Sequence, residues 1–234
     1  MVKSVASFIT ALFLFGCSAD MDSQVDLLMA FDFESGNQQW NGGVSDYPVH
    51  FEDSLAVQLS TDKVANSLPL DESAGLNISG ENPYGDLFYF FSRKVIVEPG
   101  KKYRLDFEFL IYAQLADGAV KSLSEELYLK LGAVNYKPEL EKVVWRNSED
   151  YKTLNIDKGE RNGDEGQDML NIGSIKEYAN LVPEAISGNT FDRAFEIESN
   201  KDGEIWILIG VDSGIRSNIT FGLEALTVYY TEKK

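Results

Sequence analysis

Large apolar residues stand at every second position from 103 to 111, with charged residues between them as far as Glu108, and this period of two is the strongest constraint on the fold. In a β-strand successive side chains point to opposite faces, so such a segment has one buried face and one solvated face. The turn signal Pro99-Gly100 stands directly before it. We therefore predict a long strand whose inward-facing residues are Tyr103, Leu105, Phe107, Phe109 and Ile111.

Similar alternation, or a dense run of aliphatic and aromatic residues, marks the other candidate strands. They cover residues 55–59, 86–97, 127–131, 191–198, 204–211 and 219–231. For 127–131 the alternative is a helix over 122–131, because Ser122 and Glu125 have the spacing of a capping box. Elsewhere helix signals are scarce, and we expect one short helical turn at 176–181.

Two turns organise these strands. Asp202-Gly203 supplies the positive φ angles of a tight turn, so we predict that 191–198 and 204–211 pair as a β-hairpin. Near the start, segment 31–34 alternates aromatic with acidic residues, and Ser35-Gly36 and Trp40 follow it. We interpret it as the first core strand, with a turn that leads the chain to the opposite sheet.

Many strands, Gly- and Asp-rich turns and no alternation of strand with helix predict an all-β protein. The expected architecture is a two-sheet antiparallel β-sandwich. A chain of 234 residues is long enough to bury one full core. We place a single sandwich domain at residues 27–234.

The order of cues adds a resemblance. Phe31-Asp-Phe33-Glu-Ser-Gly36 precedes Trp40, Val97-Glu-Pro-Gly-Lys-Lys-Tyr103-Arg-Leu-Asp-Phe107 follows, and a strand closes the chain. This order resembles the galactose-binding-like jelly rolls, to which many carbohydrate-binding modules belong. The blocks 31–35, 43–48, 155–159, 168–169 and 210–214 also look like those of an uncharacterised family of bacterial exported proteins. That second resemblance implies a fold and a compartment but no activity.

The N-terminus reads as a targeting segment. Lys3 precedes an apolar run over 5–15 that is too short to span a bilayer, and Leu14-Phe15-Gly16-Cys17 resembles the bacterial lipobox. We predict a lipoprotein signal peptide at 1–16, acylation (palmitate) of Cys17 as a membrane anchor, and a tether over 17–26. A plain signal peptide is the alternative. The protein would then sit in the bacterial cell envelope, on the outer membrane if the cell has two membranes.

Composition narrows the function. The net charge of −17 argues against nucleic acid as a partner. Cys17 is the only cysteine and His50 the only histidine, so thiol, Ser-His-Asp and zinc chemistry are disfavoured. The jelly-roll resemblance implies a glycan as the partner, or else an envelope protein, and we therefore expect an anchored, non-catalytic, glycan-binding sandwich. The alternatives are a glycan-active hydrolase or lyase with an Asp/Glu pair, and a structural or assembly lipoprotein.

Oxygen ligands for calcium are concentrated in segment 157–168, where glycines separate the candidate ligands Asp157, Asp164 and Asp168. The alternative for this segment is a solvated acidic loop. The jelly-roll resemblance implies a second calcium site that joins the first and last strands, with Glu34 and Glu224 at the corresponding places. Calcium is therefore the predicted cofactor.

Sugar binding usually combines an aromatic platform with a few polar groups that fix orientation. The candidate platforms are Trp40, Tyr47 and Trp145, and Asp212, within the block 210–214, is the candidate polar group. Trp40 could equally fill the core.

Overall fold

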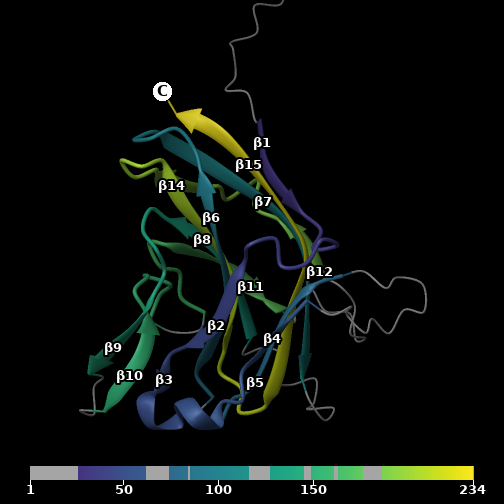
Figure 1. The fold of residues 1–234 in the computed structure, drawn as a ribbon, viewed down its shortest axis with the longest axis vertical. Helices are drawn as coiled ribbons and strands as arrows, with labels where there is room; N and C mark the ends of the chain where they lie inside the picture. Colours follow the sequence, from purple (N-terminus) through teal and green to yellow (C-terminus); the bar gives the residue numbers. More distant parts are fainter. Residues whose placement is uncertain are drawn as a thin grey trace, which may run out of the picture.

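Figure 1 shows a computed structural model of the chain, which describes residues 26–61, 74–83, 85–115, 127–144, 149–160, 163–175 and 186–233. The predicted signal peptide, Cys17, Trp145 and the helical turn at 176–181 lie outside these residues. Within the described part of the chain, no helix has the length and apolar character needed to cross a membrane.

Two antiparallel sheets form the body of the molecule, which confirms the predicted all-β sandwich (Figure 1). The larger sheet has the order β12-β7-β15-β5-β4, with β1 also paired to β15 and β13 to β7. Its strands are β1 (Asp26–Phe31), β4 (Gln58–Ser60), β5 (Leu76–Glu81), β7 (Lys102–Leu115), β12 (Ile186–Asn189), β13 (Phe195–Glu198) and β15 (Asn218–Lys233). The second sheet, β11-β8-β14-β6-β2, contains β2 (Asn41–Ser45), β6 (Leu87–Ile96), β8 (Leu127–Val134), β11 (Met169–Ser174) and β14 (Glu204–Ser213).

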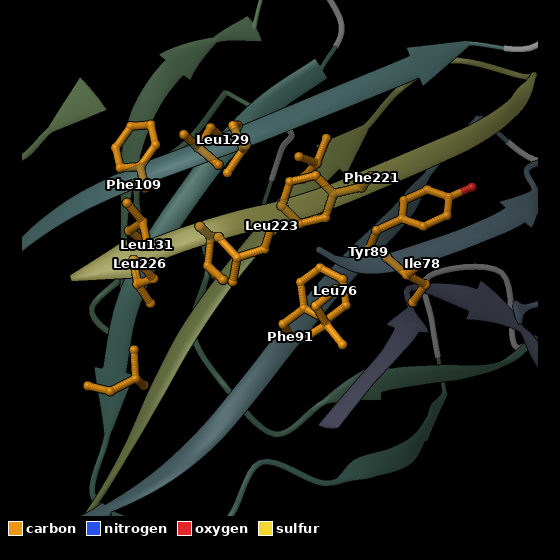
Figure 2. Packing of buried hydrophobic residues seen from close by; sticks show 14 of the residues in the cluster. Leu76, Ile78, Tyr89, Phe91, Phe109, Leu129, Leu131, Phe221, Leu223 and Leu226 are labelled. Carbon is orange, nitrogen blue, oxygen red and sulfur yellow. The ribbon is translucent and has the colours of Figure 1, made fainter. Parts of the chain in front are cut away.

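The alternating pattern of 103–111 places its apolar residues in the core, as predicted. Tyr103, Leu105, Phe107, Phe109 and Ile111 are all buried, and they lie on β7, which pairs with β15 along its length. Across the sandwich, Phe91 of β6 stacks on Phe221 of β15 with ring centroids 5.4 Å apart. Figure 2 shows these rings among the aliphatic side chains of both sheets. Removal of this apolar surface from water is the main driving force for the fold.

A third, smaller sheet was not predicted. It has the order β3-β10-β9 and consists of β3 (Tyr47–Pro48), β9 (Leu140–Val144) and β10 (Asp150–Leu154); a 3-10 helix, η1 (Val49–Ser54), follows β3. Leu154 of β10 packs into a second apolar cluster with Phe88 and Phe90 of β6 and Leu208 of β14. The five-stranded sheet is therefore buried on both faces in this region.

The predicted hairpin around Asp202-Gly203 is wrong in its pairing. The turn itself forms, since Gly203 has a φ of +73° and its N–H donates to the Asn200 carbonyl at 3.0 Å. However, β13 pairs with β7, whereas β14 pairs with β6 and β8, so the turn connects the two sheets. Turn chemistry is local, and it does not specify which strands the flanking segments join.

Several other predicted strand boundaries differ from the observed ones. The helical alternative is wrong for 127–131, which lies in β8. The expected strand at 55–59 shrinks to β4, and the one at 191–198 to β13. The predicted first strand at 31–34 is wrong in its bounds, because β1 ends at Phe31. A turn then leads to β2 in the opposite sheet, so the predicted change of sheet is confirmed.

Candidate functional site

Four ionisable side chains meet on the outer face of the five-stranded sheet. The Nζ of Lys130 (β8) lies 3.0 Å from Oδ2 of Asp212 (β14). The same oxygen is 2.6 Å from Nζ of Lys158, which follows β10, and this Nζ is 2.9 Å from Oδ2 of Asp46, between β2 and β3. We call these four residues the buried ion cluster. It ties two central strands to the segments that cover them.

Within the buried ion cluster, burial and attraction to the oppositely charged neighbours shift the pKa values in opposite directions. Burial lowers the pKa of Lys130, although attraction to Asp212 opposes the change. Burial likewise raises the pKa of Asp46 against the attraction of Lys158. For Lys158 burial alone would lower the pKa, but Asp46 and Asp212 together raise it. Lys158 is therefore held as a cation between two carboxylates.

Asp86, just before β6, extends the cluster electrostatically. Burial of its carboxyl, and then repulsion from Asp46 and Asp212, raises the pKa of Asp86 to about 6, although the residue as a whole is exposed. A carboxyl whose pKa is raised on folding favours the folded state when protonated. Stability should therefore fall as the pH rises from about 4 to about 6, and the loss should persist above this window.

We expect Asp86→Asn to be more stable than wild type near neutral pH by roughly 1 kcal/mol, a value reduced for the exposure of the residue. Below about pH 4 the two proteins should be nearly equal, because the carboxyl is then protonated in both states. Urea unfolding at both pH values measures the difference, with Asp202→Asn in the exposed β13–β14 turn as control. An advantage of Asp86→Asn that is the same at both pH values would contradict the assignment.

Three predicted ligand-binding residues are not available at the surface. Asp212 is fully buried in the ion cluster, and Trp40 and Tyr47 are 1% and 3% exposed. Trp40 packs edge-on against Phe31 and Phe33, with centroids 5.3 and 6.3 Å away. The alternative that Trp40 fills the core is therefore the one the structure supports. The pattern of alternation around Trp40 was too short to decide this from sequence.

The acidic loop 157–168 is organised by its own hydrogen bonds. Asp157 accepts from the N–H groups of Gly159 and Gln167, at 3.1 Å each. Oδ2 of Asp168 accepts from the Tyr136 hydroxyl at 2.9 Å and from the Asp157 N–H at 2.8 Å. These two carboxylates therefore brace the loop. Asp164 is exposed in the same loop.

Glu34 and Glu224 differ in environment. Glu34 is exposed and accepts weakly from the Ala74 N–H at 3.4 Å, whereas Glu224 is 5% exposed at a bulge in β15. Across the described residues, no three His, Cys, Asp or Glu side chains converge in a way that could hold a metal ion. Calcium at either place therefore stays a prediction, and no step below depends on a metal.

His50 lies at the surface in η1. Its Nδ1 is 2.9 Å from Glu149, and the side chain is 59% exposed. Its ring also contacts that of Phe51. These contacts account for the residue as a surface histidine.

A polar groove lies at the edge of the larger sheet, where β4, β5 and β15 run side by side (Figure 1). Its volume is about 380 Å³, and its polar lining residues are Gln58, Ser79, Glu81, Asn218 and Thr220. Ser79 stands opposite both Gln58 and Thr220 in register, and Glu81 stands opposite Asn218. Directly opposite residues share a face of an antiparallel sheet, so these amides and hydroxyls project together.

Backbone strain marks the same groove. Ala56, one of its lining residues, has a φ of +46°, in a left-handed region that residues with a side chain seldom adopt. The neighbouring Leu55 carbonyl accepts from the Glu81 N–H at 2.8 Å, which fixes this corner against β5. Strained conformations persist where the surroundings impose them, and they concentrate at binding sites. Sequence reasoning missed this groove, because its residues come from three strands whose register the sequence did not reveal.

The chemistry of the groove is that of hydrogen bonding. Glu81 is the one carboxylate among its described lining residues. A glycoside hydrolase needs two carboxyl groups about 5 to 10 Å apart across the scissile bond. The described lining of the groove therefore suits holding a polar ligand rather than cleaving it.

Comparison with known proteins finds solved structures of similar fold. No family model matches the sequence, and no curated protein matches it. The chain is similar to the xylan-binding module CBM22-1 of Paenibacillus barcinonensis at 10% identity and a TM-score of 0.40, over 91% of this chain and 99% of that one. It is also similar to the mannan-recognising module TmCBM27 at 13% identity and a TM-score of 0.37, over 90% of this chain and 100% of that one. TmCBM61, solved with β-1,4-galactotriose, matches at 12% identity and a TM-score of 0.35, over 86% of this chain and 94% of that one.

These three structural neighbours are carbohydrate-binding modules. At TM-scores below 0.5 the similarity transfers no function to this chain. The assignment as an antiparallel β-sandwich rests on the two sheets themselves.

Proposed function

We propose that this protein is a non-catalytic binding protein that holds a neutral glycan in the groove between β4, β5 and β15. The observation that carries the proposal is the lining of that groove by two amides, two hydroxyls and one carboxylate on a shared sheet face. Such groups match the donors and acceptors of sugar hydroxyls. Ala56, an exposed lining residue, adds apolar surface for C–H groups of the ligand.

Charge favours a neutral glycan over an acidic one. The protein carries a net charge of −17, and the charged side chain among the described lining residues is Glu81. A polyanionic sugar would be repelled on approach and would find no cation in this lining. Neutral polysaccharides meet neither penalty.

A pair of matched threonine variants tests the groove. Thr220→Val removes a lining hydroxyl while keeping the shape of the side chain, and we expect about a tenfold loss of glycan affinity. Thr227→Val makes the same change on the outer face of the same strand, away from the groove, and should bind as wild type. Xylohexaose, β-1,4-galactotriose and mannan, together with a neutral glycan array, are the probes, and calorimetry measures the affinity. The proposal fails if no neutral glycan binds, or if Thr220→Val binds as tightly as Thr227→Val.

We further propose that acylated Cys17 anchors the protein to the envelope membrane, on the outer membrane of a cell with two membranes. The lipobox-like sequence before Cys17 supports this proposal. The Cys17→Ser variant is expected to move from the membrane fraction to the soluble fraction. Mass spectrometry of the membrane-extracted wild type should show an acylated N-terminal Cys17; an unmodified cysteine would exclude the anchor.

A further inference from the structure

The two fully buried members of the buried ion cluster are an amine and a carboxylate on the outer face of the five-stranded sheet. Lys130 and Asp212 lie on the neighbouring strands β8 and β14, both side chains are 0% exposed, and Nζ is 3.0 Å from Oδ2. Gly210 stands directly opposite Lys130, and the Phe88 ring lies so close over Gly210 that a Cβ there would be 2.5 Å from it. The aromatic ring thus takes the place of a side chain beside the pair and helps to exclude water.

The two carboxylate oxygens of Asp212 differ in their hydrogen bonding. Oδ2 is shared by two ammonium groups, of Lys130 and Lys158, whereas Oδ1 is buried with no hydrogen-bond partner. A buried acceptor without a donor is costly and rare in folded proteins. A buried ion pair also carries a large desolvation penalty. Both costs fall on the same carboxylate.

We propose that Lys130 and Asp212 condense to an intramolecular amide, an isopeptide bond that cross-links β8 to β14. The Nζ of Lys130 forms a bond to Cγ of Asp212, and the bond from Cγ to Oδ1 breaks. The three ammonium protons are accounted for: one stays on the amide nitrogen and two leave with Oδ1 as water. No oxidant or further reactant is needed, and the total charge is unchanged.

The surroundings supply what the condensation requires. Burial depresses the pKa of Lys130, which favours the neutral, nucleophilic amine. A hydrogen bond of 2.7 Å from Nζ to the Lys158 carbonyl holds this amine in place, next to the carboxyl it attacks. The Lys158 ammonium, 2.6 Å from Oδ2, is placed to stabilise the negative charge that develops on that oxygen.

The amide product removes both the desolvation cost of the buried ion pair and the unpartnered acceptor. The amide is neutral, so two charges disappear from the interior, and Lys158 keeps its acceptor on the remaining oxygen. The unpartnered Oδ1 is the atom that departs. The cross-link would join adjacent strands near the β2–β3 corner and so lock the sheet beneath its covering segments.

Peptide mapping of the purified full-length protein tests the cross-link. We expect a branched peptide that contains both Lys130 and Asp212, and an intact mass lower by one water than the processed sequence requires. Linear peptides with each residue at its calculated mass would overturn the proposal. So would a branch through Lys158 instead of Lys130.

The Lys130→Arg variant is the matched control, because it keeps the charge but removes the amine. Its intact mass should show no loss of water. If this variant loses water as wild type does, the loss comes from another reaction, such as ring closure at an Asp-Gly pair, and the cross-link is excluded. Because the wild-type peptide map decides independently, the test stands even if Lys130→Arg does not fold.

Discussion

Asp212→Ala is expected to lower the free energy of unfolding by about 3–5 kcal/mol, the usual cost of removing one partner from a buried ion pair. The variant leaves Lys130 fully buried without its carboxylate, and Lys158 with Asp46 alone. Urea unfolding followed by tryptophan fluorescence measures the change. If Asp212 is cross-linked to Lys130, the loss should be at least this large, because the covalent link disappears as well.

Asp202→Ala is the control for this prediction, since Asp202 is exposed and pairs with Lys201 in the turn before β14. We expect little change from it, as is usual for a surface ion pair. A loss for Asp212→Ala no greater than that of the surface control would show that the cluster does not contribute to stability.

Trp40→Ala is expected to cost about 3–5 kcal/mol as well, because it leaves a large cavity in the core. The ring is 1% exposed and packs against Phe31 and Phe33, which connect the first strand with the opposite sheet. Thermal or urea unfolding gives the loss directly. Glycan affinity of the folded fraction should stay at the wild-type value, since Trp40 is not among the residues that line the groove.

Trp40→Phe separates packing from polarity. The indole Nε1 is buried with no hydrogen-bond partner, so its loss removes a polar cost while most of the apolar contact remains. We expect a much smaller destabilisation than for Trp40→Ala. If Trp40→Ala lowered glycan affinity without lowering stability, the earlier interpretation of Trp40 as a binding platform would be restored.

The sequence was sufficient for the fold class and for the long strands β6, β7, β8, β14 and β15, whereas β2, β3, β5 and β9 to β12 were not predicted. The period of two in 103–111 depends only on the chain neighbours of each residue, and β7 forms with all five apolar residues inside. The turns predicted at Gly36 and Gly203 also form, since both residues adopt positive φ. Such features depend on steric and hydrophobic preferences that act over a few residues.

Partners and burial were decided only by the tertiary structure. Asp202-Gly203 forms its turn, yet β13 and β14 join different sheets, because each finds a longer partner strand elsewhere. Asp212 was predicted to bind a ligand, but it is fully buried and pairs with Lys130 and Lys158. The groove residues become neighbours only through the register of β4, β5 and β15. Local patterns determine which face of a strand is apolar, whereas long-range pairing determines what that strand lies against, and the sites of this protein depend on the second.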